Sequence, residues 1–132
     1  MTYLLDTDTL NYLIKGQTKV ETRYRAFSQK DIGISVITEG EIWHGVAKNK
    51  PGHEKLTRLK LLLESISILP ITSDVARMYG EIRSKLEKDG QPIGPNDFWI
   101  AAHALSLGAT LVTNNVREFK RIKGLKVENW LT

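Results

Sequence analysis

Short runs of β-type residues alternate with amphipathic stretches along all 132 residues of the chain. The short runs, such as "IGIS" at 32–35, hold three or four residues each and are typical of buried strands. The longer stretches place apolar residues at helical spacing, as "LTRLKLLL" does at 56–63. This pattern predicts strands at 3–5, 32–35, 67–70 and 110–113 and helices at 9–15, 20–30, 37–48, 55–65, 73–90 and 96–107, before "LKVENW" closes the chain.

Several predicted helices have residues at their ends that start or stop a helix. Ser73 is suited to cap the helix that follows it, whereas Pro51 and Gly108 terminate the helices before them. Strands separated by helices predict an α/β fold, a three-layer domain with a short central parallel sheet flanked by helices. In such sheets the functional site lies outside the carboxyl ends of the strands. Asp6 and Asn115 follow two of the strands and are therefore candidates for that site.

The composition is that of an ordinary globular protein, with 41% hydrophobic and 26% charged residues, and the length predicts a single domain, residues 1–132. The absence of cysteine excludes disulfides and thiolate metal sites and fits a reducing cytoplasm. The N-terminus reaches Asp6 after a run of only three apolar residues, which is too short for a signal peptide. No apolar run approaches the roughly 20 residues that span a bilayer. We therefore expect a soluble protein of the cytoplasm.

The net charge of +4 is unevenly distributed along the chain. Residues 48–60 and residues 117–126 each carry five Lys or Arg against one Glu, so that together they carry +8 and the rest of the chain carries −4. Such segments are typical either of solvated helix faces or of surfaces that bind a polyanion. On the second interpretation, the candidate nucleic-acid contacts in the first segment are Lys55, Arg58 and Lys60.

Asp6 and Asp8, in "LLDTDTL", admit three interpretations. The pair resembles the Asp-x-Asp motif of the haloacid-dehalogenase phosphatases, in which the first Asp is a covalent nucleophile. That motif has Thr or Val four residues after the first Asp, where this chain has Leu10. It also has an acidic pair after a later strand, where this chain has "TNN". The two acids can instead end a strand and cap the next helix, or they can bind a metal ion.

Asp97 heads a helix face that should be buried, since Ile100, Ala101 and Ala104 follow it on the same face. An unpaired buried carboxylate is costly, so Asp97 either caps its helix or is held there for a purpose. Asn96 competes with it for the capping position.

Glu41 shares its helix face with Ile37 and Gly45, although the same spacing suits a half-buried surface residue. After the strand at 110–113, Thr113 offers a hydroxyl and Asn115 an amide to the same end of the sheet. Asn115 can alternatively cap the short helical turn that follows it.

If Asp6, Glu41 and Asp97 converge, their mutual repulsion requires a cation. Two like charges about 4 Å apart repel by about 4 kcal/mol at an effective dielectric of roughly 20. Oxygen ligands without cysteine favour Mg²⁺ or Mn²⁺ over zinc, and the three histidines show no metal-ligand spacing. A carboxylate-held Mg²⁺ beside a basic surface is suited to the hydrolysis of phosphodiesters.

Four segments together resemble the PIN-domain ribonucleases of the VapC toxin type: "LLDTDTLNYLI", "ISVITEGEIWHG", "GQPIGPNDFWIAAHALSLGATLVTNNVREFKRI" and "VENW". They span almost the whole chain, and "PIGPNDFWIAAHA" is the most specific of them. The resemblance implies that Asp6, Glu41 and Asp97 are the catalytic acids, with Asp6 and Asp97 as the principal ligands of one or two Mg²⁺ or Mn²⁺ ions. It therefore favours a metal ligand over a nucleophile at position 6.

Two positions depart from the family pattern. Many PIN domains have a fourth acid after the late strand, where this chain has Asn115, and a neutral ligand should weaken a second metal site. Asp8 stands where Asn is commoner and adds a carboxylate. We therefore expect auxiliary roles for Asp8, Thr113 and Asn115.

The resemblance also implies partners. It predicts a bacterial or archaeal toxin that forms a homodimer, is neutralised by a cognate VapB-like antitoxin and contacts operator DNA only through the antitoxin complex. The expected substrate is structured RNA, with tRNA, and the initiator tRNA in particular, as the candidate. The alternatives are a catalytically weak PIN-like binding module, which Asn115 favours, and a DNA-directed nuclease with the same site.

Overall fold

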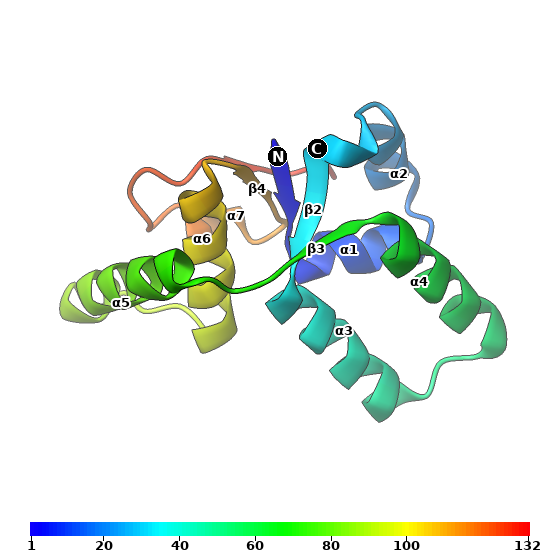
Figure 1. The fold of residues 1–132 in the computed structure, drawn as a ribbon, viewed down its shortest axis with the longest axis horizontal. Helices are drawn as coiled ribbons and strands as arrows, with labels where there is room; N and C mark the ends of the chain where they lie inside the picture. The colour runs from blue at the N-terminus through cyan, green and yellow to red at the C-terminus, as the bar shows by residue number, and fades with distance from the viewer.

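The computed structural model describes residues 1–132 as a five-stranded parallel sheet with helices on both faces (Figure 1). The strands are β1 (Tyr3–Leu5), β2 (Ile32–Ser35), β3 (Ser67–Leu69), β4 (Thr110–Val112) and β5 (Val127–Glu128). They lie in the order β3-β2-β1-β4-β5, so the first strand of the chain occupies the centre of the sheet. This arrangement confirms the predicted three-layer α/β fold.

Seven α-helices and one 3₁₀ turn connect the strands. They are α1 (Thr7–Ile14), α2 (Thr18–Arg25), η1 (Gln29–Asp31), α3 (Val36–Asn49), α4 (His53–Ser65), α5 (Ser73–Lys88), α6 (Pro95–Leu107) and α7 (Val116–Phe119). As predicted, α6 ends at Gly108, which adopts a left-handed conformation with φ of 64°. No helix is long and apolar enough to cross a membrane.

One predicted helix end and one predicted cap residue are wrong. The helix expected at 20–30 ends at Arg25, because Phe27 leaves the helix and packs its ring 4.6 Å from that of Tyr3 and 5.8 Å from that of Trp130, measured between centroids. The cap expected at Ser73 lies one residue earlier, where the Thr72 hydroxyl accepts a hydrogen bond of 3.4 Å from the Val75 amide.

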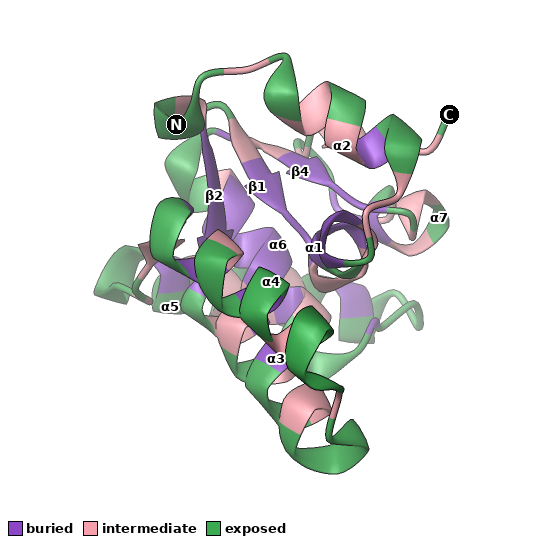
Figure 2. Ribbon diagram, turned by 90° about the vertical axis from the view of Figure 1, so that its right-hand side faces the viewer, coloured by how far each residue is buried: buried purple, intermediate pink, exposed green.

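Alternate residues of β1 and β4 face two separate cores. Leu5 and Val112 belong to the core beneath α1, α2 and α4, whereas Leu4 and Leu111 belong to the core beneath α5, α6 and α7. Figure 2 shows the buried strands enclosed between these helices, with exposed residues on the outer helix faces. Because β1 and β4 pair in parallel, with Leu5 opposite Val112, their carboxyl ends lie at the same edge of the sheet.

Candidate active site

Asp6 lies directly after β1, at the carboxyl edge of the sheet, and is 5% exposed. Its Oδ2 accepts a hydrogen bond of 2.7 Å from the hydroxyl of Thr113, which follows the neighbouring strand β4. Its Oδ1 accepts a hydrogen bond of 2.8 Å from the Thr7 amide, and Asp6 is the N-cap residue of α1. The capping interpretation therefore describes one oxygen of Asp6, while the other oxygen joins a polar cluster at the strand ends.

Asp8 is part of the same cluster. Its Oδ2 accepts a hydrogen bond of 3.0 Å from the backbone amide of Asn114. The same oxygen lies 3.4 Å from the Thr113 hydroxyl, which also donates a hydrogen bond to Asp6. A single buried hydroxyl thus links both members of the Asp-x-Asp pair to the end of β4.

Asp97 stands in the first turn of α6, but it does not cap that helix. The N-cap residue is Gly94, followed by Pro95 at the first helical position, so neither Asp97 nor Asn96 has the role. The Asp97 carboxylate is partly buried, and it appears in none of the side-chain hydrogen bonds or ion pairs of the structure. An ideal Cβ at Gly94 would lie only 3.3 Å from Asp97 Oδ2, so the glycine leaves room for this carboxylate.

Glu41, on α3, is held from two other helices. Its Oε1 accepts a short hydrogen bond from the Thr7 hydroxyl of α1, and its Oε2 accepts a hydrogen bond of 3.4 Å from the side-chain amide of Asn96 in α6. Glu41 and Asp97 line one shallow hollow together with residues 94–96. The surface interpretation of Glu41 accounts for its partial exposure, but its charge also acts on Asp97.

Glu118, on α7, is a fifth acid of this region that sequence reasoning missed. Asn115 stands at the N-cap position of α7, yet its side chain makes no capping bond and instead donates a hydrogen bond of 2.6 Å to Glu118 Oε2. The negative charge of Glu118 acts on Asp97. The three-residue spacing between Asn115 and Glu118 suggests such a bond. In the sequence, however, Glu118 stands out only as the single acid of the basic segment 117–126.

Burial and neighbouring charges raise the pKa of two acids of the cluster, Asp6 and Asp97. Burial, and next to it the charge of Asp8, raises the pKa of Asp6 to about 7. Burial, followed by the charges of Glu41 and Glu118, raises the pKa of Asp97 to about 6. Both shifts show that negative charge is crowded and poorly solvated at this edge of the sheet.

The acids do not form a closed metal cage. No group of three or more His, Cys, Asp or Glu side chains is arranged to hold one ion. This arrangement differs from a zinc or calcium cage, but it fits Mg²⁺, which usually retains several waters and binds through one or two carboxylates together with substrate phosphates. The unbonded carboxylate of Asp97 and the buried carboxylate of Asp6 offer oxygen donors of the type that Mg²⁺ prefers.

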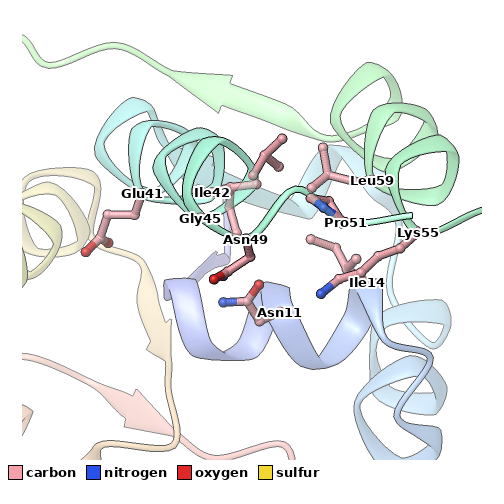
Figure 3. Close-up of a pocket in the computed structure, with 10 residues that line it drawn as sticks. Asn11, Ile14, Glu41, Ile42, Gly45, Asn49, Pro51, Lys55 and Leu59 are labelled. Atoms are coloured by element: carbon pink, nitrogen blue, oxygen red, sulfur yellow. The ribbon is translucent and has the colours of Figure 1, made fainter. Parts of the chain in front are cut away.

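The three basic residues predicted on α4 do not share one face. Lys55 lines a pocket between α1, α3 and α4, with Glu41 at its other end (Figure 3). Arg58 lines a different hollow, and its Nη2 lies 2.7 Å from the position that a Cβ on Gly16 would occupy. Lys60 is exposed about 140° around the helix from Lys55. Of the three, only Lys55 shares a pocket with a residue of the acid cluster.

Comparisons with known proteins agree with this fold. The sequence model of the PIN domain matches residues 3–125. The VapC2 ribonuclease of Rickettsia felis is 39% identical over 132 residues, or 98% of either chain. The tRNA(fMet)-specific endonuclease VapC of Shigella flexneri is 35% identical over 129 residues, or 97% of either chain.

Solved structures show the same likeness. A chain in the crystal structure of VapBC2 from Rickettsia felis, bound to a DNA fragment from the promoter, matches with a TM-score of 0.90 and 38% identity, over 98% of this chain and 99% of that one. The chain therefore belongs to the PIN-domain family, and the relatives that it matches over nearly its full length are VapC ribonucleases.

Proposed function

We propose that this protein is a Mg²⁺- or Mn²⁺-dependent endoribonuclease toxin that cleaves structured RNA. The observation that carries the proposal is the electrostatic coupling of Asp97, whose carboxylate makes no hydrogen bond, to acids of other elements: the charges of Glu41, Glu118 and Asp8 act on Asp97, and the charge of Asp97 acts on buried Asp6. The charges of neighbouring acids raise the cost of ionising Asp6 and Asp97, as expected of a site built for a cation. The kinship with VapC ribonucleases supports RNA as the substrate.

The three acids divide two tasks in this proposal, metal binding and the positioning of water. Asp6 and Asp97 hold the metal ion, with Thr113 fixing the orientation of the Asp6 carboxylate. Glu41, held by Thr7 and Asn96, positions the water that attacks the phosphodiester. When bound, the ion lowers the pKa of a coordinated water and stabilises the charge that develops on the phosphate. Asp8, Asn115 and Glu118 act as auxiliary groups around these three.

Partners of the relatives suggest partners for this chain. Related chains occur in VapBC complexes, one of them bound to promoter DNA, so we propose a VapB-like antitoxin that neutralises the chain and connects it to operator DNA. The tRNA(fMet) specificity of the Shigella flexneri relative makes the initiator tRNA the first substrate to test. A homodimer remains part of the proposal.

The basic residues of α4 are proposed to contact the RNA. Lys55 is the member best placed for this role, because it shares a pocket with Glu41. Arg58 and Lys60 point elsewhere along the same helix and would meet more distant parts of the substrate.

The test is the cleavage of total RNA and of initiator tRNA by the purified, antitoxin-free chain, with wild type beside Asp6→Ala and with Mg²⁺, Mn²⁺ or EDTA. We expect discrete fragments that vanish with the substitution and with chelation. No cleavage by well-folded, metal-loaded protein would favour the binding-module alternative. Equal cleavage of a matched DNA would instead favour the DNA-directed nuclease.

A further inference from the structure

Cations recur at every third residue of the second basic segment, residues 117–126. Arg117, Lys120, Lys123 and Lys126 are all exposed. The apolar residues between them are Phe119, Ile122 and Leu125, of which Phe119 is 0% and Ile122 3% exposed, with Leu125 packed against the same core. The segment thus buries its apolar residues in the core that includes α6 and leaves these four cations, called the cation row below, exposed.

The cations of this row have no acidic partners. The ion pairs of the structure are Arg23–Glu128, Arg25–Glu21, Arg83–Glu87 and Lys85–Asp89, and none involves residues 117–126. The only acid of the segment is Glu118, whose carboxylate is bonded to Asn115 and acts on Asp97. The row is therefore a concentrated, uncompensated positive charge.

The row begins beside the acid cluster. Glu118, next to Arg117, belongs to that cluster. The Arg121 guanidinium donates a hydrogen bond of 3.1 Å to the carbonyl oxygen of Pro92, in the loop that leads into α6 and Asp97. These two attachments fix the segment at one border of the site, whereas Lys55 and its pocket with Glu41 lie at another.

We propose that Arg117, Lys120, Lys123 and Lys126 bind the phosphates of the RNA strand that leaves the acid cluster on the α7 side. The proposal rests on the proposed function, since a site rich in carboxylates repels the RNA backbone and needs neighbouring cations to hold it. RNA fits the row better than a protein partner does, because lysine is depleted at protein interfaces and the apolar residues of the segment are already buried. Phosphate contacts carry no sequence information, so the row positions the strand and does not select it.

The test measures RNA binding against salt concentration, with every protein in an Asp97→Asn background and a fluorescent initiator-tRNA transcript as the probe. The test variant carries Arg117→Gln, Lys120→Gln, Lys123→Gln and Lys126→Gln. Its control removes four unpaired, exposed cations elsewhere through Lys19→Gln, Lys30→Gln, Arg77→Gln and Lys88→Gln, which gives the same net charge. A double variant, Lys120→Gln with Lys123→Gln, serves if the fourfold variant is unstable.

We expect the slope of log K against log salt to become shallower by about 3 in the fourfold variant, by about half of that in the double variant, and little in the control. An unchanged slope would overturn the proposal, and an equal loss in the control would overturn it in favour of net charge alone. The result is separable from the proposed function. Wild-type cleavage with an unchanged slope rejects only the binding row, and a shallower slope without any wild-type cleavage rejects only the nuclease.

Discussion

The Asn115 side-chain amide donates a hydrogen bond of 2.6 Å to Glu118 Oε2 across the single turn of α7. The bond gives Asn115 a role that its sequence position did not suggest, that of a hydrogen-bond partner of Glu118. Besides standing where many PIN domains have a fourth acid, Asn115 bonds to an acid three residues further on. That acid raises the pKa of Asp97 and so contributes its charge to the cluster.

Glu118→Gln is expected to weaken Mg²⁺ binding by about 10- to 100-fold, the range typical of lost groups that support a metal site. Asn115→Ala should shift the affinity in the same direction by a smaller factor, because Glu118 keeps its charge but loses its partner. Isothermal titration with Mg²⁺ measures both. Glu64→Gln removes an exposed charge on α4 and should leave the affinity unchanged. Wild-type affinity in Glu118→Gln would exclude Glu118 from the site.

Asp97→Asn is expected to reduce RNA cleavage by about a hundredfold or more while leaving the fold intact. The carboxylate makes no hydrogen bond that the substitution would break, and its loss relieves repulsion from Glu41. Circular dichroism and thermal unfolding test the fold, and a gel assay tests cleavage. Asp74→Asn provides a matched control, since Asp74 also lies in the first turn of a helix, α5, but is exposed. Undiminished cleavage by Asp97→Asn would remove Asp97 from the mechanism.

Thr113→Val is expected to lower the free energy of unfolding at pH 8 by about 1–3 kcal/mol, the cost of leaving a buried polar atom without its partner. The Thr113 hydroxyl is fully buried and donates a hydrogen bond to Asp6 Oδ2. It also accepts a hydrogen bond of 3.0 Å from the backbone amide of Asn115. Valine fills the same space without the hydroxyl. Thr113→Ser keeps the hydroxyl and should stay within about 1 kcal/mol of wild type. Wild-type stability in Thr113→Val, measured by urea unfolding, would show that the bond does not matter, and an equal loss in Thr113→Ser would show that the methyl group contributes as much as the hydroxyl.

The strands and the polar residues at their ends were predictable, because both follow from local pattern. β1 and β2 begin and end where the sequence placed them, and the rule for parallel sheets located Asp6 and Asn115 correctly at one edge. The helix face that Asp97 heads is buried as its spacing indicated, with Ile100 and Ala101 both 0% exposed.

The contacts that complete the site were not predictable from local pattern. Thr7 meets Glu41 across 34 residues of sequence, and Asn96 meets it across 55, so only the packing of three helices reveals these bonds. The same limit applies to the helix predicted at 20–30, where burial of Phe27 against Trp130 overrides helix propensity. Helical spacing alone could have separated Lys55 from Lys60, since five residues correspond to about 140° around a helix.

Asp6→Asn is expected to stabilise the metal-free protein at pH 8 while abolishing cleavage. The pKa of Asp6 is raised to about 7 by burial and by Asp8, so at pH 8 the folded state carries a charge that it holds at a cost on the order of 2 kcal/mol or more. The folded state binds this proton more tightly than the unfolded state does. Unfolding therefore releases a proton between about pH 4 and 7, and the free energy of unfolding falls as the pH rises through that window.

The gain from Asp6→Asn should follow the same window. It should be largest at pH 8 and disappear below about pH 3, where Asp6 is protonated in both states. Urea unfolding in EDTA at several pH values measures it, with Glu64→Gln as the exposed control that should show no such trend. Added Mg²⁺ should stabilise wild type more than Asp6→Asn, because only wild type keeps the carboxylate ligand. A stability difference that stays constant with pH would mean that Asp6 is not a strained buried charge, and the case for a cation at this position would lose its electrostatic basis.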